Sequence, residues 1–347
     1  MRVTIVGPTW HARWTNSVRD AFQELQHTAT VLEYPVPRGL YTTLPWLPRK
    51  IRNHLQGPIH RTRAVGQQAA NYLFGRRLIA HVEQERPDLV LLLKSQIISP
   101  AMIAALKRSY AVPVATWWVD DPFEFPSAIA MAPYSDRFFV FSRHWVRRLQ
   151  SMGVSGARFL PCAYDPEVYR PLVLSAEDRQ TYEAPIAFIG TRDRHRDNVL
   201  ATIGDLPLAI WGPAWDGACA LGDIRVPPEA IRGSGLTPEE VAKALNAVRI
   251  SINVHKLQSR DGGVNMRTFE AAACGAFQLV DAIPDLEELF IPGEEVILYH
   301  DTDELRRLAL YYLDHPDEAA AIAAKAQARS LREHTFRHRM ATLLDMM

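Results

Sequence analysis

Short runs of consecutive apolar residues alternate along the chain with longer segments in which apolar residues recur every three to four positions. The runs predict buried parallel strands, and the periodic segments predict helices that cover them. One run, Arg2–Val6, stops at Gly7-Pro8, and another, Asp88–Leu93, follows Pro87. Strands that alternate with helices in this way are typical of an α/β fold with parallel, doubly wound sheets.

The alternation is interrupted once and then restarts. Between about 160 and 185 prolines are frequent and no apolar face is sustained, which predicts a linker. Ile186–Ile189 then runs into Gly190 much as the first strand runs into Gly7. We therefore predict two tandem Rossmann-like domains. The expected bounds are 1–165 for the N-terminal domain, 166–185 for the linker, 186–330 for the C-terminal domain and 331–347 for a terminal helix.

Helical periodicity predicts several of the covering elements. A helix over 16–27 would be capped by Asn16 or Ser17 and would bury Val18, Phe22 and Leu25. Further helices are expected over 100–109, 143–152, 238–247, 303–314 and 316–333.

Composition narrows the class of protein. A chain of 347 residues can fill two cores, and its 39 basic and 39 acidic residues leave no net charge, which argues against a dedicated nucleic-acid binder. The three cysteines, Cys162, Cys219 and Cys274, form no CxxC pair and suggest neither a disulfide framework nor a zinc site. No secretory signal or run of about 18 apolar residues is present, so we expect a soluble, cytoplasmic protein.

One segment departs from this charge balance. No acidic residue lies between Glu33 and Glu83, whereas eight Lys and Arg residues fall between Arg38 and Arg77. Prolines are frequent in its first part, so we predict an excursion from the first domain over about 35–80. It is either a solvated loop or, through residues 38–77, a contact for an anionic acceptor or a membrane surface.

The first candidate site is a glycine turn that leads into a helix. Gly262-Gly263 precedes a segment of small residues, and the N-terminus of such a helix presents backbone N–H groups and a positive dipole to a diphosphate. Glu270, expected in the first turn, can accept hydrogen bonds from two ribose hydroxyls. The alternative is a capped helix whose acid merely complements the dipole.

The second candidate follows the strand that ends at Gly190. Arg192, Arg194 and Arg196 come directly after it, and arginine offers a permanently charged fork for phosphate. Because strand ends face the ligand crevice of an open α/β sheet, this segment is a candidate phosphate cradle. A solvated polar turn is the alternative.

The third candidate lies in the first half of the chain. The strand Pro113–Val119 ends in Asp120 and Asp121, followed by a proline. These carboxylates can bind sugar hydroxyls or act as a general base, and they can equally cap the following turn.

The chain resembles group-one glycosyltransferases of the GT-B fold, and within them the spore-maturation CgeB-like branch. The resemblance covers nearly the whole chain and is strongest over about 186–340. Its most specific part is Arg267–Gly275 within the segment Asn265–Ala276. Weaker matching pieces are Trp118–Pro122, Leu160–Ala163, Phe188–Gly190, Asn246–Asn253 and Phe277–Val280.

The resemblance implies that the C-terminal domain holds a nucleotide-sugar donor, the N-terminal domain holds the acceptor, and the last helix crosses back to the first domain. Gly190 would approach the donor phosphates, Arg196 or Arg192 would contact the diphosphate, and Glu270 would bind the ribose. The further donor contacts would be His255, Lys256, Asn265, Arg267 and Thr268, and the acceptor-side residues would be Gly7, Trp14, Asn16 and Asp120.

One departure leaves the stereochemistry open. Many retaining relatives carry a second glutamate eight residues before the ribose acid, where this chain has Gly262, preceded by Asp261. If the reaction inverts, Asp120 or Asp121 is the expected base, while a retaining reaction requires no protein base.

These observations predict a glycosyltransferase that moves a sugar from a nucleoside diphosphate-sugar to a glycan, lipid-linked, protein or natural-product acceptor. Arg196 would stabilise the leaving group, and we expect neither a metal nor another cofactor, and no nucleic-acid partner. The alternatives are a nucleotide-sugar epimerase or hydrolase, or a non-catalytic subunit that binds glycan or nucleotide.

Overall fold

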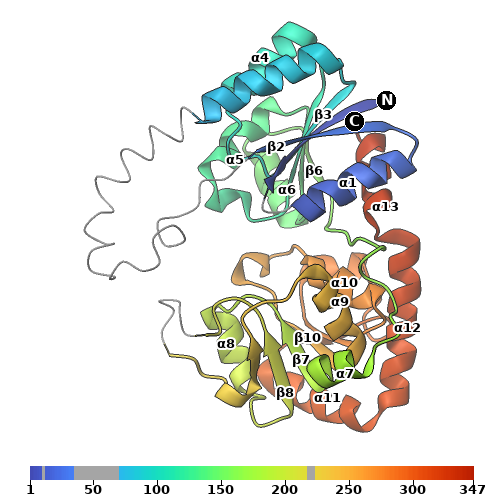
Figure 1. Ribbon diagram of the computed structural model, residues 1–347. Helices are drawn as coiled ribbons and strands as arrows, with labels where there is room; N and C mark the ends of the chain where they lie inside the picture. The colour runs from blue at the N-terminus through green and yellow to red at the C-terminus, as the bar shows by residue number, and fades with distance from the viewer. Residues whose placement is uncertain (10–11, 35–69, 217–222) are drawn as a thin grey trace, which may run out of the picture. The chain divides into compact units, whose positions relative to one another are not determined.

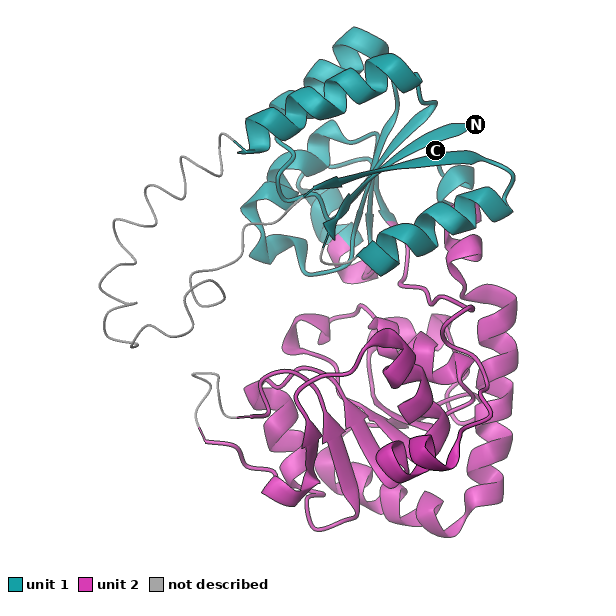
Figure 2. Ribbon diagram, viewed as in Figure 1, with its two compact units in different colours: residues 1–140, 146–158, 343–347 teal, residues 141–145, 159–342 magenta. Residues whose placement is uncertain are grey.

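The computed structural model describes residues 1–9, 12–34, 70–216 and 223–347. The chain forms two compact units (Figure 2). Unit 1 comprises residues 1–140, 146–158 and 343–347, and unit 2 comprises residues 141–145 and 159–342. Most of the predicted basic excursion, at 35–69, lies outside the described residues, while 70–85 forms a helix of unit 1.

Unit 1 is built on a six-stranded sheet in the order β2-β1-β3-β4-β5-β6. The pairings from β2 through β5 are parallel. The strands are β1 (Arg2–Pro8), β2 (Thr28–Tyr34), β3 (Leu89–Leu93), β4 (Val114–Trp118), β5 (Arg137–Val140) and β6 (Ala157–Phe159). The helices are α1 (Ala12–Glu24), α4 (Pro100–Tyr110), α5 (Pro126–Met131) and α6 (Arg143–Ser151), with 3₁₀ turns η2 (Pro122–Glu124) and η3 (Ala132–Tyr134) (Figure 1).

The first strand of unit 1 lies inside its sheet, not at an edge. All residues of β3 and β4 are buried, as expected for strands covered by helices on both faces. The chain leaves β1 toward β2 on one side and returns to β3 on the other, so the strand order reverses between β1 and β3. Gly7 lies at this point, and a Cβ on it would come within 2.2 Å of the Thr15 hydroxyl. The glycine therefore lets α1 pack closely on β1.

Unit 2 repeats this plan in the order β12-β11-β10-β7-β8-β9, with every pairing parallel. Its strands are β7 (Ala184–Ile189), β8 (Leu208–Trp211), β9 (Ile231–Gly233), β10 (Val248–Asn253), β11 (Gln278–Asp281) and β12 (Ile297–Tyr299). Its helices are α7 (Ala176–Tyr182), α8 (Arg194–Ala201), α9 (Pro238–Ala247), α10 (Met266–Ala273), α11 (Thr302–Asp314), α12 (Pro316–Glu333) and α13 (Phe336–Asp345), whose residues from 343 onward belong to unit 1. The 3₁₀ turns are η4 (Pro228–Ala230), η5 (Leu257–Ser259) and η6 (Pro284–Glu288).

The core of unit 2 packs side chains of α8, α11 and α12 against the sheet. Phe188 lies 6.1 Å from Trp215 and Phe277 lies 4.4 Å from Tyr312, measured between ring centroids. Here the strand order reverses between β7 and β10. In open α/β sheets, ligands bind outside the carboxyl ends of the strands at such a reversal.

Two stretches of unit 2 that adjoin unit 1 in sequence are tied together. Tyr164 forms a parallel bridge with Thr335. The Arg339 guanidinium donates to the carbonyls of Pro161 and Cys162, at 3.1 and 2.9 Å, and to His334 Nδ1 at 2.9 Å. Burial, with the Arg339 charge as a second cause, lowers the pKa of His334 to about 4.

The structure confirms the two tandem parallel α/β units and the C-terminal helices, and the helix predicted over 238–247 is α9. The last residues, 343–347, group with unit 1, where Arg137 Nε donates to the Met346 carbonyl at 2.6 Å. The predicted cap of the first helix is wrong, because α1 begins at Ala12 and both Asn16 and Ser17 lie inside it. The Ser17 hydroxyl donates to the Arg13 carbonyl at 2.9 Å, one turn earlier. The predicted linker over 166–185 contains helix α7.

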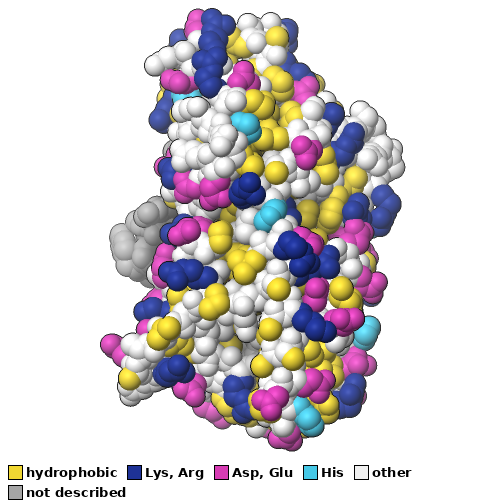
Figure 3. All heavy atoms as spheres, turned by 90° about the vertical axis from the view of Figure 1, so that its right-hand side faces the viewer, with side chains coloured by type: hydrophobic (Ala, Val, Ile, Leu, Met, Phe, Trp, Pro, Cys, Tyr) yellow, Lys and Arg dark blue, Asp and Glu magenta, His cyan; other side chains and the backbone are white. Residues whose placement is uncertain are grey.

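Charged side chains of both signs are interspersed over the face that Figure 3 shows. None of the helices within the described residues combines the length and the apolar character needed to cross a membrane.

Candidate functional site

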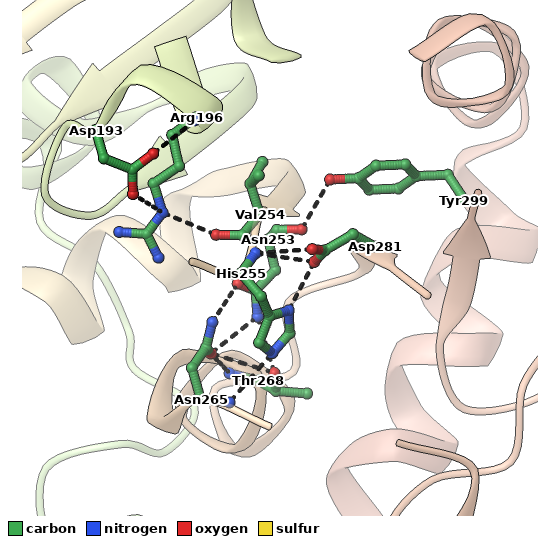
Figure 4. Close-up of polar contacts among 9 residues, drawn as sticks. All are labelled: Asp193, Arg196, Asn253, Val254, His255, Asn265, Thr268, Asp281 and Tyr299. Carbon is green, nitrogen blue, oxygen red and sulfur yellow. Dashed lines mark hydrogen bonds and ion pairs between the residues drawn. The ribbon is translucent and has the colours of Figure 1, made fainter. Parts of the chain in front are cut away.

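Two loops and two helix N-termini meet where the strand order of unit 2 reverses. Gly190 follows β7, and Val254 and His255 follow β10. The N-cap residues Asp193 of α8 and Asn265 of α10 lie at the same carboxyl edge (Figure 4). This edge is therefore a candidate ligand site of unit 2.

Arg196 joins the two strand ends. Its Nε donates to the Val254 carbonyl at 2.9 Å, and its Nη1 donates to the Thr191 carbonyl at 2.9 Å. The nearest acid, Asp193, is 3.8 Å from Nε, and Nη2 makes no hydrogen bond within the described residues. Burial lowers the pKa of Arg196. An arginine fixed by carbonyls, with N–H groups to spare, is suited to receive an anion.

The loop after β7 is closely packed around Gly190. A Cβ on this residue would lie 2.9 Å from the Phe188 ring, and a Cβ on Gly212 would lie 1.9 Å from the Gly190 carbonyl oxygen. Trp215 Nε1 donates to that same oxygen at 2.9 Å, and the Gly190 N–H donates to the Trp211 carbonyl. Gly190 thus shapes the loop sterically, and its own N–H is already used.

The N-terminus of α10 is fixed by a pair of asparagines (Figure 4). The side chains of Asn253 and Asn265 exchange hydrogen bonds at 3.1 and 2.8 Å, and Asn253 also donates to the Thr268 hydroxyl at 2.8 Å. Asn265 caps the helix by accepting from the Thr268 N–H. The backbone N–H groups of Met266 and Arg267, at the first two helical positions, have no partner within the described residues.

His255 is a positioning residue at this edge. Its Nε2 accepts from the Asn265 N–H at 3.1 Å, which leaves the proton on Nδ1, and Nδ1 donates to Asp281 at 2.6 Å. The Asp281 carboxylate also accepts from the His255 N–H, and the Tyr299 hydroxyl donates to the Asn253 carbonyl at 3.1 Å. Both ring nitrogens of His255 are therefore occupied in orienting α10.

Arg267 and Glu270 link α10 to the end of β7. Arg267 Nη1 contacts the Glu270 carboxylate at 2.5 Å, and Arg267 Nε donates to the Ile189 carbonyl at 3.3 Å. Burial and then the Glu270 charge raise the pKa values of Tyr169 and of Cys274, the latter to about 12. The prediction that Glu270 lies in the first turn is wrong: α10 begins at Met266, which places Glu270 in the second turn, one turn along from Arg267.

Arg192 lies in a different environment from Arg196. It is buried, and its Nε and Nη2 contact Asp197 at 3.2 and 2.7 Å. Nη2 also donates to the Asp223 carbonyl at 2.8 Å, while Asp197 accepts from the Arg225 N–H at 3.0 Å. The charge of Arg192 is therefore paired with Asp197 inside unit 2, and the two side chains together hold residues 223–225 by hydrogen bonds to the backbone.

The remaining predicted residues lie at other places. Lys256 is exposed and lines a pocket together with His255. In unit 1, Trp14 is buried edge-on against Trp117 with ring centroids 5.6 Å apart, and Asn16 lies in α1. Gly7 packs against Thr15, as described above.

The two aspartates after β4 have different partners. Asp120 pairs with Lys94, which follows β3, whereas Asp121 caps η2 by accepting from the Phe123 N–H at 2.8 Å. Asp121 therefore has the capping role that the sequence left open, and Asp120 is the carboxylate held by a cation at the edge of the sheet.

Sequence reasoning missed Asp281, Asp285 and Lys94. Asp285 accepts from the N–H groups of Gly263 and Arg143 at 2.8 and 3.1 Å, and burial raises its pKa. Two of these residues could have been found from their position at the carboxyl end of a strand, since Asp281 ends one buried strand and Lys94 follows another. In the part of the chain that the structure describes, no three His, Cys, Asp or Glu side chains are grouped as metal ligands.

Comparisons with known proteins agree with this architecture. The glycosyl transferase-like family matches residues 194–345. Spore protein CgeB of Bacillus subtilis (strain 168) is 22% identical over 267 residues, which are 74% of this chain and 81% of CgeB.

Solved structures match over the whole length. Sucrose-phosphate synthase from Thermosynechococcus elongatus has a TM-score of 0.68 at 13% identity, with 99% of this chain and 98% of that chain covered. HepE of Anabaena, solved with UDP-glucose, has a TM-score of 0.68 at 12% identity and full coverage of both chains. UDP-GlcNAc 2-epimerase from Neisseria meningitidis, solved with UDP-GlcNAc, has a TM-score of 0.50 at 12% identity, with 99% and 100% covered. The chain thus has the GT-B fold, its residues 194–345 match the glycosyl transferase-like family, and it is distantly similar to spore protein CgeB.

Proposed function

We propose that this protein is a glycosyltransferase that takes its sugar from a nucleoside diphosphate-sugar bound to unit 2. The observation that carries the proposal is the pairing of Arg196 with the N-terminus of α10 at the reversal of strand order. There a fixed cation with remaining N–H groups and two helix amides that have no partner among the described residues occupy one edge of the sheet. HepE, solved with UDP-glucose on the same fold, supports the choice of ligand class.

In this proposal the diphosphate lies between Arg196 and the first turn of α10. As the bond to the anomeric carbon breaks, negative charge develops on the leaving phosphate. Preorganised cations and backbone dipoles stabilise such charge without reorganising, and this is usually the largest contribution to catalysis. Arg196 and the N–H groups of Met266 and Arg267 are the donors for it, so the proposed reaction proceeds without a metal.

Glu270 is the proposed ribose ligand. Its carboxylate is oriented by Arg267, which is itself fastened to the end of β7. A carboxylate held in this way accepts hydrogen bonds from two vicinal hydroxyls without having to be ordered first. Asn265 and Thr268 shape the helix terminus, and His255 positions it, while Arg192 stabilises the fold of unit 2.

Asp120 is the proposed base if the reaction inverts, acting on the acceptor hydroxyl in the N-terminal domain. Asp120 is preferred to Asp121 because the Asp121 carboxylate accepts the Phe123 N–H in the cap of η2. The acceptor is a hydroxyl-bearing glycan, lipid-linked sugar, protein or natural product.

A thermal-shift screen tests the donor site. Wild type, Glu270→Ala and Arg196→Ala would be heated with UDP, GDP or TDP in EDTA, with exposed Arg337→Ala as the matched control. A nucleotide at about 100 times its Kd should add roughly 2.7 kcal/mol of stability. We expect one nucleotide to stabilise wild type and the control but neither site variant.

Three other outcomes would count against the proposal. Stabilisation that survives both site substitutions would place the nucleotide elsewhere. Folded wild type that responds to no nucleotide would favour a binding subunit. Turnover of the matching nucleotide-sugar without any acceptor would indicate an epimerase or hydrolase.

A further inference from the structure

Unit 2 contains a pocket next to the proposed donor site. A pocket of about 510 Å³ opens at the carboxyl ends of β10, β11 and β12. Arg196, Arg267 and Glu270, the proposed donor contacts, are not among its lining residues. Its volume falls within the range of about 300–1,000 Å³ that is usual for small-molecule sites.

The pocket is lined by basic side chains that have no acidic partner in the part of the chain that the structure describes. Lys256, Arg260 and His195 line it, and none of the three forms an ion pair or hydrogen bond with its side chain within the described residues. Lys256 and Arg260 are exposed and His195 is partly exposed, so their N–H groups are accessible to a ligand.

The acids that line the same pocket are engaged by other groups. Asp281 accepts from the backbone and ring of His255. Asp301 caps α11 by accepting from the Glu304 N–H at 2.8 Å, and His300 contacts Glu304 at 2.9 Å. Asp281 and Asp301 keep their negative charges, but these hydrogen bonds engage their carboxylates. Lys256 and Arg260 are therefore the charged groups of the pocket that are available to a ligand, and the N-terminus of α11 adds positive potential.

The walls of the pocket are apolar. Val199, Leu257 and Ile283 contribute to them. Cationic donors combined with apolar walls suit a ligand that has a phosphoryl group on a compact carbon skeleton. We propose that this pocket binds a small phosphate monoester, with Lys256 and Arg260 as the principal ligands of its phosphoryl group.

His255 connects this pocket to α10. It lines the pocket, and its Nε2 accepts the N–H of Asn265, the N-cap of α10. A bound ester therefore contacts the residue that orients the donor helix, and its binding should change nucleotide affinity. This coupling rests on the proposed donor function, whereas binding of the ester does not.

Isothermal titration with glucose 6-phosphate tests the pocket, with glucose as the uncharged control and inorganic phosphate as the minimal probe. We expect glucose 6-phosphate to bind wild type and glucose not to bind. Lys256→Ala/Arg260→Ala should weaken the binding at least tenfold. Arg232→Ala/Arg337→Ala, which removes the same charge from exposed positions that do not line the pocket, should leave it unchanged, and so should Arg196→Ala.

Equal binding by the two double variants, or no binding to wild type at 10 mM ester, would overturn the proposal. Loss of binding in Arg196→Ala would also overturn it, because the phosphate would then occupy the donor site. A last measurement distinguishes two roles of the bound ester, acceptor and effector. Incubation with a nucleotide-sugar and mass spectrometry would detect a glycosylated ester if it is the acceptor. An altered nucleotide Kd without such a product would identify an effector.

Discussion

The two units share a strand plan but present different groups at the same topological position. In each unit the first strand lies inside its sheet and the strand order reverses beside it. Gly7 is the next-to-last residue of that strand in unit 1, and Gly190 directly follows it in unit 2. In unit 1 the space over the glycine is filled by Thr15 of α1. In unit 2 the corresponding edge has Arg196 and the first turn of α10.

The charges at these edges differ as well. In unit 1 the cation after β3, Lys94, is paired with Asp120 after β4, so positive and negative groups neutralise each other. In unit 2 the nearest acid to Arg196 Nε is 3.8 Å away, and Asp281 instead binds His255. Topology thus provides the same reversal of strand order in both units, and the side chains at the strand ends decide whether that edge suits an anion.

The largest expected effect on stability comes from comparing Arg192, in the loop after β7, with Arg196, in the first turn of α8, two residues that the sequence presents as equivalent. Arg192→Ala should destabilise the protein by about 3–5 kcal/mol, because it leaves the Asp197 carboxylate buried without its partner. Arg196→Ala should cost less stability but abolish stabilisation by nucleotide. Urea unfolding and nucleotide thermal shifts on both variants measure the two effects. Nucleotide binding that depends on Arg192 in a fully folded protein would contradict this division of roles.

Acid should weaken unit 2 through His334. Its pKa in the folded protein is about 4 against an ordinary 6.5, so the unfolded chain binds its proton first. The stabilising contribution is complete above pH about 6.5 and is lost progressively as the pH falls through about 4, with a total of about 3 kcal/mol. Urea unfolding of wild type and His334→Gln at pH 7 and pH 5 measures it. An equal loss of stability in both proteins would assign the acid sensitivity to other groups.

The glycines of the two units should respond differently to a compensating substitution. Gly7→Ala meets the Thr15 side chain, and overpacking of this kind costs about 1–3 kcal/mol. Thr15→Ala in the same chain should recover part of the loss. Gly212→Ala meets the Gly190 carbonyl oxygen at a positive φ, so no side-chain substitution should relieve it. Thermal unfolding of the single and double variants compares them, and a Gly7→Ala protein as stable as wild type would show that α1 can shift.

The long periodic elements could be predicted from the sequence because the spacing of their apolar residues shows which face of each element is buried. The helix expected over 238–247 is α9, and the run of apolar residues up to Leu93 contains β3. Helix α7 was missed because its seven residues have no apolar periodicity. The capping box of Ser175 and Asp178 was the available signal.

The candidate site was predictable only in part. The glycine turn is confirmed, since Gly262 and Gly263 both have positive φ. The difference between Arg192 and Arg196 was not predictable, because it depends on Asp197 and on the carbonyls of Asp223 and Val254, which tertiary packing brings together. The same holds for His255, whose role depends on an acid 26 residues away.

Substitutions of the two aspartates of unit 1, Asp120 and Asp121, should have the smallest effects on stability but different effects on transfer. Asp121→Asn keeps an acceptor for the Phe123 N–H and should leave stability nearly unchanged, while Asp121→Ala removes it and should cost about 1 kcal/mol. Neither Asp121 variant should change the rate of transfer if Asp121 only caps η2.

Asp120→Asn should be as stable as Asp121→Ala, because the pair with Lys94 is partly exposed and such pairs contribute about 0–1 kcal/mol. If the reaction inverts, this variant should lose transfer at least a hundredfold, since general-base catalysis contributes about 10²–10⁴-fold. Rates for the three variants with a matched donor and acceptor decide the question. Full activity in Asp120→Asn would remove the base from unit 1 and favour a retaining reaction, and unit 1 would then serve to bind the acceptor without activating it.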